Sequence, residues 1–173
     1  MEKEIEIKLT YEDKEEVKSK LIEMGLVEGK TVNLEDRYYS QKGNSMENTN
    51  DLVRIRKEED QIEFTFKGKC KDENNIWTRN ETSVKIGDMD AMHNILLMLG
   101  FKIIKENASE RNYWEKDNIQ IIFIKYSKPT ILEMMEIESN DKKKIENMLN
   151  RLKGKVKEAG EELFNVFDKK GDS

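Results

Sequence analysis

Strict alternation of apolar and charged residues over many short segments is the feature that most constrains how this chain can fold. Between Glu2 and Leu9 the apolar residues take every second position and charged residues fill most of the others. A period of two places these two kinds of side chain on opposite faces of a β-strand. The pattern predicts eight strands: Glu2 to Leu9, Leu52 to Lys57, Gln61 to Lys69, Thr78 to Ile86, Lys102 to Glu106, Arg111 to Lys116, Ile119 to Tyr126 and Ile131 to Ser139.

Segments with a helical period lie between some of these strands. Thr10 with Asp13 is typical of a capping box, and Gly25 is a natural stop for the helix that follows. That helix would bury Val17, Leu21 and Met24; a second, from Asp88 to Leu99, would bury Met92, Ile95, Leu96 and Leu99; two more fit Asp141 to Lys153 and Glu158 to Asp168. We expect a polar loop over Gly43 to Asn50 and a turn at Pro129.

Composition limits the classes of protein that the chain can belong to. Its 173 residues suit one domain, expected over residues 1–168, with a disordered C-terminal tail at 169–173. The 31 basic and 36 acidic residues give a net charge of −5, which argues against a nucleic-acid partner. No apolar stretch approaches the roughly 20 residues that span a bilayer, and no signal-peptide core is present, so we expect a cytoplasmic protein with no membrane partner.

Single copies of two residue types exclude several kinds of site. Cys70 alone allows neither an intramolecular disulfide nor a cysteine zinc site, and His93 as the single histidine almost excludes histidine-based metal sites and a Ser-His-Asp triad on this chain. The helical pattern around His93 predicts a helix-surface or boundary residue. Any chemistry must therefore use carboxylates, lysines and arginines.

Charges of opposite sign are carried by different strands. Glu4 with Glu6, and Glu136 with Glu138, form carboxylate pairs about 6.6 Å apart on one face of a strand. Such oxygens suit Mg²⁺ or Mn²⁺ between two strands. Other strands carry cations that suit the oxygens of a polyphosphate: Arg54, Arg56, Lys67, Arg79, Lys105 and Arg111.

Two arrangements would accommodate these charges. One is a single-layer sheet with a solvated charged face, which would be an interaction surface. The other is a closed barrel of about eight strands, whose interior holds side chains or one small ligand. Burying each uncompensated ion costs several kcal/mol, and a bound polyanion with its metals would offset that cost. The segregation of charge by strand favours the barrel with a highly charged small ligand.

An approximate internal repeat supports closure. The first copy has Glu4-Ile-Glu-Ile-Lys8, a helix, a glycine stop and Asp36-Arg-Tyr-Tyr39. The second has Glu81-Thr-Ser-Val-Lys85, a helix, a glycine stop and Glu110-Arg-Asn-Tyr-Trp114. Two halves of strand, helix and strand pair, related by approximate two-fold symmetry, would bring their charged faces together.

The ordered motifs resemble the CYTH superfamily, also called triphosphate tunnel metalloenzymes. Glu4-Ile-Glu-Ile-Lys8 has the Glu-x-Glu-x-Lys signature. The resemblance continues in order through Asp36-Arg-Tyr-Tyr39, Leu52-Val-Arg-Ile-Arg56, Phe64-Thr-Phe-Lys67-Gly68, Arg79-Asn-Glu81, Leu99-Gly-Phe101 and Glu136-Ile-Glu138. It covers about residues 1–167 and is strongest for the class IV adenylate cyclase and thiamine triphosphatase branch.

The resemblance implies an α+β fold, an eight-stranded antiparallel tunnel with helices outside, and it implies site roles by position. Glu4, Glu6, Glu136 and Glu138 would hold Mg²⁺ or Mn²⁺, and Glu81 would orient an arginine or reach a second metal. Lys8, Arg54, Arg56, Lys67, Arg79, Lys105 and Arg111 would bind the phosphates. Lys8 would also position the attacking water, so that Lys8, Glu4 and Glu6 form the catalytic group.

The implied activity is hydrolysis of inorganic, nucleoside or thiamine triphosphate. The alternatives are cyclisation of ATP to cyclic AMP and pyrophosphate, and triphosphate binding without catalysis. The last is motivated by Ile124-Lys125-Tyr126, which stands where the family commonly has an acidic residue and puts a second metal site in doubt. Glu133 would replace that ligand only if it does not lie in an exposed turn.

Several aromatic residues are candidates for contact with a ligand. The residues Tyr38, Tyr39, Tyr113 and Trp114 would either pack in the core or stack on a base, and Trp77, in a polar loop, would line the tunnel mouth. A homodimer would be favoured by apolar strand faces that the helices leave uncovered.

Overall fold

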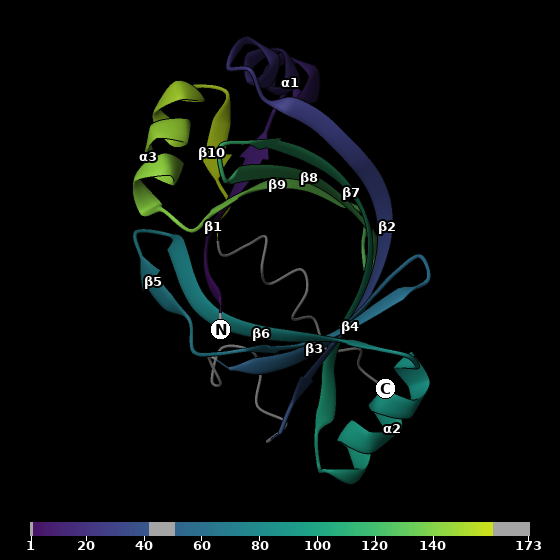
Figure 1. Ribbon diagram of the computed structural model, residues 1–173. Helices are drawn as coiled ribbons and strands as arrows, with labels where there is room; N and C mark the ends of the chain where they lie inside the picture. Colours follow the sequence, from purple (N-terminus) through teal and green to yellow (C-terminus); the bar gives the residue numbers. More distant parts are fainter. Residues whose placement is uncertain (1, 42–50, 161–173) are drawn as a thin grey trace.

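A closed antiparallel barrel dominates the computed structural model, which describes residues 2–41 and 51–160 (Figure 1). Its strands follow the order β1-β9-β8-β7-β2-β3-β4-β6, and β6 pairs again with β1. These strands are β1 (Glu2–Tyr11), β2 (Val27–Ser40), β3 (Leu52–Glu58), β4 (Gln61–Lys67), β6 (Ile76–Ile86), β7 (Lys102–Lys116), β8 (Ile119–Lys128) and β9 (Leu132–Ser139). The predicted eight-stranded barrel is confirmed.

Two short strands extend the sheet outside the barrel. The first, β5 (Lys71–Glu73), pairs with β6, and the second, β10 (Val156–Glu158), pairs with the end of β1. Strand β1 is thus shared, because its first half pairs with β6 and its second half with β10. The opposite edge of β1 pairs with β9.

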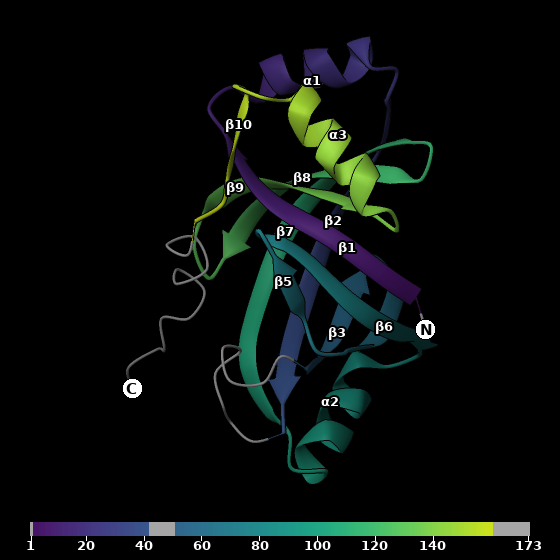
Figure 2. The same cartoon turned by 90° about the vertical axis from the view of Figure 1, so that its left-hand side faces the viewer.

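In the part of the chain that the structure describes, three helices are present, and they pack on the outside of the barrel (Figures 1 and 2). They are α1 (Lys14–Glu23), α2 (Met89–Met98) and α3 (Lys142–Arg151). Helices α1 and α3 lie on one side, over apolar residues of β1, β8 and β9 that form the largest core cluster. Helix α2 lies on the opposite side, over a second cluster that includes Tyr39, Val53 and Ile55. The apolar faces of the strands therefore point outward to the helices.

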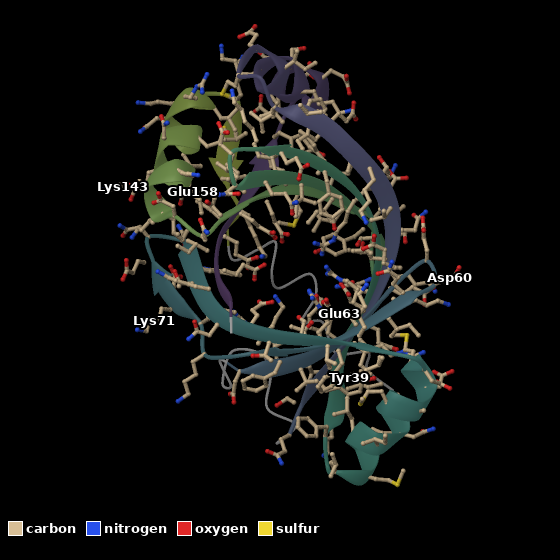
Figure 3. All side chains as sticks on the ribbon, viewed as in Figure 1. Tyr39, Asp60, Glu63, Lys71, Lys143 and Glu158 are labelled. Carbon is tan, nitrogen blue, oxygen red and sulfur yellow. The ribbon has the colours of Figure 1, made fainter. Side chains whose placement is uncertain are left out.

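The other face of each strand points into the barrel. In β1 the buried Ile5, Ile7 and Leu9 belong to the outer core, so the intervening Glu4, Glu6 and Lys8 face inward. Successive side chains of the other barrel strands also point alternately inward and outward, so each strand has an inner and an outer face. Figure 3 shows side chains of both charges inside the barrel, with Glu63 among them.

The order of strand, helix and strand pair occurs twice, as β1-α1-β2-β3 and β6-α2-β7-β8. Each copy ends its helix in the same way, because Gly25 and Gly100 have φ values of 77° and 84°. This left-handed region suits a residue without a Cβ atom. Helix α1 begins later than the Thr10 and Asp13 pattern predicts: Asp13 alone is the N-cap, and its side chain accepts from the backbone of Glu15 and Glu16.

Several predicted boundaries are wrong. The two strands predicted over residues 102–116 are one continuous strand, β7. Strands β2, β5 and β10 were not in the predicted set, and Trp77 lies in β6 rather than in a loop. The prediction for α3 holds, but on α2 Ile95 and Leu99 are exposed, while Met89 is buried.

Some predictions concern residues outside the described ranges. The loop at 43–50 and the tail at 169–173 lie there, as does most of the helix predicted over 158–168. Its first residue, Glu158, ends β10. Among the described residues, none of the helices has the length and apolar character needed to cross a membrane.

Candidate functional site

Three carboxylates from two strands converge inside the barrel. Glu4 and Glu6 come from β1, Glu138 comes from β9, and one oxygen of each lies within 4.8 Å of the others. The register explains the convergence, because Glu6 is the direct partner of Glu138 across the β1–β9 ladder. Directly paired residues share one face of a sheet with Cβ atoms about 5 Å apart.

Crowding of negative charge changes the ionisation of this cluster. Burial, together with Glu4, Glu136 and Glu6, raises the pKa of Glu138 to about 8. Burial and a hydrogen bond with Glu81 raise the pKa of Glu4 from its ordinary value. Like charges held close together in a low-dielectric site disfavour each other, and a divalent cation would relieve that repulsion.

Glu136, the fourth predicted metal ligand, lies among cations instead. Its carboxylate is 2.9 Å from Lys8 Nζ and 3.5 Å from Arg111 Nη1. Burial alone would raise the pKa of Glu136, but Lys8 and Arg111 lower it to about 2. Lys8 also donates to Glu6 at 2.7 Å. The structure therefore separates Glu136 from the three-carboxylate cluster, and its role as a metal ligand stays a prediction.

Lys8 is held in its charged form. Burial alone would lower its pKa, but Glu136 and Glu6 raise it well above the ordinary value for lysine. Its Nζ also lies 4.8 Å from the ring centroid of Trp77, a position in which the aromatic face attracts a cation. Lys8 can therefore donate hydrogen bonds and supply positive charge, but it cannot accept a proton near neutral pH.

Glu81 and Lys67 link the carboxylates to the cations. The two side chains form an ion pair across the β4–β6 ladder, and Lys67 Nζ also lies 3.4 Å from Glu4 Oε2. Burial alone would raise the pKa of Glu81, but the hydrogen bond with Glu4 and the charge of Lys67 lower it. Glu81 thus borders the three-carboxylate cluster and restrains Lys67.

Three predicted phosphate-binding arginines have hydrogen-bond donors without partners. The Nε atoms of Arg54, Arg79 and Arg111 are buried and have no partner within the described part of the chain. They come from β3, β6 and β7, whose inner faces surround the same interior. Buried donors without partners are rare in folded proteins, and an anionic ligand would satisfy them.

Arg56 is already engaged. Its Nε and Nη2 donate to the two carboxylate oxygens of Asp36 at 2.7 and 2.8 Å, across the β2–β3 ladder. Burial alone would raise the pKa of Asp36, but Arg56 lowers it from its ordinary value of 3.8. Asp36 shares one face of β2 with the apolar Val32 and Leu34. The sequence alone assigns it no role, because those apolar neighbours give no sign that this face points into the barrel.

The remaining predicted cation, Lys105, lies toward the other end of β7. Its Nζ is 5.6 Å from the ring centroid of Tyr38. Tyr38 and Tyr113 lie on the inner faces of their strands, whereas Tyr39 and Trp114 belong to the outer cores under the helices. Tyr39 donates to or accepts from His93 on α2, with 3.0 Å between the atoms. Only two of the four aromatic residues considered for base stacking are therefore in a position to do so.

One part of the inner wall is apolar. Ile122, Ile124, Tyr126 and Met134 form a third cluster on the inner faces of β8 and β9. Lys125 points outward to Glu133, which is exposed and also accepts from Tyr11 at 3.2 Å. Glu133 is therefore an exposed strand residue and does not extend the three-carboxylate cluster.

A cavity opens beside the carboxylates. Its volume is about 1030 Å³, and its lining includes Glu4, Glu81 and Glu138 together with the turn between β7 and β8. Ligand pockets commonly measure about 300–1,000 Å³. The site therefore has an acidic, accessible end and a cationic middle region, and this arrangement suits a polyanion that carries divalent metal.

The sequence matches a known protein family. The CYTH domain family model matches residues 2–166. A Methanocaldococcus jannaschii protein named "Putative adenylate cyclase MJ0240" is 32% identical over 117 residues, which span 68% of this chain and 66%, just under two thirds, of that relative.

Solved structures share the fold. PH1819 from Pyrococcus horikoshii has a TM-score of 0.73 and 24% identity, over 94% of this chain and 98% of that one. HpAC1 from Hippeastrum, described as a "Putative adenylyl cyclase" that reveals a dominant triphosphatase activity, has a TM-score of 0.68 and 14% identity, over 95% of this chain and 94% of that one. At these identities the likeness establishes the fold alone. Because the family model covers nearly the whole sequence, the chain belongs to the CYTH domain family.

Proposed function

We propose that this protein is a metal-dependent enzyme that hydrolyses a triphosphate inside its barrel. The observation that carries the proposal is that the Glu4, Glu6 and Glu138 carboxylates lie within 4.8 Å of one another, in a barrel whose Arg54, Arg79 and Arg111 have buried Nε atoms without a hydrogen-bond partner in the described part of the chain. Phosphoryl transfer requires little from a protein beyond positioning and neutralisation of charge. Both parts of this arrangement serve that requirement.

The three carboxylates fit Mg²⁺ or Mn²⁺. Both ions prefer oxygen ligands, and Glu4, Glu6 and Glu138 offer only oxygens. When bound, the metal would neutralise charge on the phosphate oxygens. The raised pKa values of Glu4 and Glu138 arise from burial and from neighbouring carboxylates, a repulsion that a cation offsets.

The cations of the inner wall bind the phosphates. Arg54, Arg79 and Arg111 supply the donors that have no partner, and the planar guanidinium group matches phosphate geometry. Lys8 lies next to Glu6 and stays charged. It therefore orients a phosphate oxygen or the attacking water by donating a hydrogen bond rather than by removing a proton.

A substrate panel tests the proposal. Inorganic triphosphate, ATP, GTP and thiamine triphosphate are each incubated with Mg²⁺ and with Mn²⁺, and all products are identified. We expect orthophosphate release that requires metal and is lost in Glu4→Ala and Glu6→Ala. Full activity in both variants, or tight binding of every ligand without turnover, would contradict the proposal.

Cyclisation of ATP is the second candidate, and it is favoured by the name of the relative at 32% identity. In that reaction the ribose 3′-hydroxyl attacks the α-phosphorus of ATP, and pyrophosphate leaves. The same carboxylates and arginines would serve it. The panel separates the two reactions, because cyclic AMP with pyrophosphate indicates cyclisation and orthophosphate indicates hydrolysis.

A further inference from the structure

Two neutral side chains interrupt the row of cations along the inner face of β7. Lys105, Asn107, Ser109 and Arg111 occupy alternate positions on this strand and therefore share one face. The ladder with β2 pairs Asn107 with Asp36 and Ser109 with Leu34. Because the Asp36 side chain binds Arg56 on the inner wall, Asn107 and Ser109 lie on the inner wall too.

The side chains of both neutral residues are buried and make no hydrogen bond to the residues that the structure describes. Asn107 is 5% exposed and Ser109 is 3% exposed. Within the described part of the chain, Asn107 Nδ2, Asn107 Oδ1 and Ser109 Oγ have no partner. The neighbouring Asp36 is committed to Arg56 and to the Tyr38 hydroxyl, so it does not satisfy Asn107. An amide buried with both its donor and its acceptor free is uncommon unless a ligand or water completes it.

The surroundings of this pair combine the flanking cations Lys105 and Arg111 with aromatic and apolar side chains. Ser109 is directly opposite Tyr126, which belongs to the apolar cluster of the inner wall. Tyr38 lies next along β2 from Asp36 on the same face. Aromatic and apolar side chains with a few convergent polar atoms are typical of a site for an organic group, whereas inorganic triphosphate offers only charged oxygens.

Resting on the proposed function, we propose that Asn107 and Ser109 form a subsite that selects triphosphates carrying a heterocycle with an amino group beside a ring nitrogen. The amide of Asn107 presents one donor and one acceptor side by side, which is the complement of that edge and is how asparagine binds adenine. Both amide atoms lack partners, so either orientation of the side chain is available. Adenine and the aminopyrimidine of thiamine share this edge.

The order along β7 fits one ligand spanning both regions. Along β7, Ser109 lies about 6.6 Å from Arg111, and Asn107 lies about twice as far from Arg111 in the same direction. In this arrangement Arg111 binds phosphate and Asn107 binds the ring, and Lys105 lies two residues beyond Asn107 on the same face. Asn107 and Ser109 are specificity-determining residues in this arrangement, and they take no part in the reaction itself.

Titration calorimetry on the full chain in EDTA tests the subsite, because removing metal keeps metal-dependent hydrolysis from consuming the ligands. The ligands are inorganic triphosphate, ATP, thiamine triphosphate and purine riboside triphosphate, which lacks the amino group of ATP. In the wild type we expect ATP, thiamine triphosphate or both to bind at least about tenfold more tightly than purine riboside triphosphate. Asn107→Leu should raise the ratio of the Kd for the preferred ligand to that for inorganic triphosphate by a similar factor.

Asn33→Leu is the matched control, because Asn33 is exposed on β2 and lies outside the barrel interior. It should keep the wild-type ratio. Ser109→Ala and Asn107→Ala repeat the comparison should Asn107→Leu fail to fold. Equal losses of affinity for inorganic and organic triphosphates, or unchanged Kd ratios in every variant, would overturn the subsite. Water would then be the hydrogen-bond partner of the buried amide.

The same titrations separate this inference from the proposed function. Binding of inorganic triphosphate with no preference for an amino heterocycle would overturn the subsite alone. Failure of the wild type to bind any triphosphate, with Mg²⁺ or Mn²⁺ also tried, would overturn both. Loss of affinity for ATP but not for thiamine triphosphate in Asn107→Leu supports adenine as the bound ring, and the reverse supports the aminopyrimidine.

Discussion

Lys8 Nζ lies 2.9 Å from Glu136 Oε1, so the ammonium group of β1 is the counter-ion of a carboxylate on β9. Two residues further along β9, Glu138 has carboxylates as its neighbours instead. Near neutral pH the two glutamates therefore differ in charge. Glu136 has a pKa of about 2 and is ionised, whereas Glu138 has a pKa of about 8 and is mainly protonated. One strand thus supplies a partner for a cation and a candidate ligand for a metal.

This difference predicts unequal effects on metal affinity. Glu138→Gln should weaken Mn²⁺ binding by at least about tenfold, because it removes one of three converging carboxylates. Glu136→Gln is the matched variant and should weaken it less, since Glu136 is held by Lys8 and Arg111. Titration calorimetry with Mn²⁺ measures both, and an equal loss would place Glu136 in the metal site as well.

Removing Arg111 should weaken triphosphate binding. Arg111→Gln eliminates a buried cation with a free donor, and we expect the Kd for inorganic triphosphate to rise at least about tenfold. Arg151→Gln removes the same charge from the exposed surface of α3 and serves as the control. Should the two variants bind equally well at low ionic strength, general charge attraction rather than the inner wall would account for affinity.

The Asp36–Arg56 ion pair makes stability depend on pH. Asp36→Asn leaves the Arg56 cation buried without its counter-ion and should lower the unfolding free energy by about 3–5 kcal/mol at neutral pH. The pKa of Asp36 in the folded state is below 3.8, so its contribution is complete above that value and is lost as the pH falls through the folded pKa. Urea unfolding at about pH 7 and about pH 2 measures the difference in unfolding free energy between wild type and variant. This difference should be smaller at the acid pH, and an equal difference at both would contradict the prediction.

The outer core should affect stability more than ligand binding. Leu21 lies on the face of α1 that packs against the barrel and is fully buried, and Leu21→Ala should cost about 2–5 kcal/mol of unfolding free energy. Its neighbour Ile22 is 63% exposed, and Ile22→Ala should cost less than about 0.5 kcal/mol. Thermal or urea unfolding compares them, and equal costs would show that α1 does not stabilise the barrel through this face.

The inner face of the barrel was predictable wherever apolar and charged residues alternate. A period of two fixes which side chains share a face, so Glu4, Arg54, Lys67 and Glu138 could be assigned to one interior. Strand β2 was missed because Glu28 to Thr31 are polar on both faces. Strand β7 was divided for the same reason, since Asn107 to Glu110 interrupt the contrast between its faces.

Individual contacts inside the barrel were beyond prediction. Which cation meets which carboxylate depends on the register of neighbouring strands, and the pattern along one strand does not give its register with a partner to which no tight turn joins it. The sequence therefore grouped Glu136 with the metal ligands and Arg56 with the free cations. Only the pairing of β1 with β9 and of β2 with β3 reveals that both are already occupied.

Strand β1 both carries Glu4, Glu6 and Lys8 and joins β6 to β9. It is the first strand along the chain, and β9 is the last strand of the barrel. Until β9 has formed, Glu6 has no Glu138 opposite it and Lys8 has no Glu136. A chain that is still emerging from the ribosome therefore has no assembled site. The pairing of β9 with β1, which closes the barrel, also brings the site residues together.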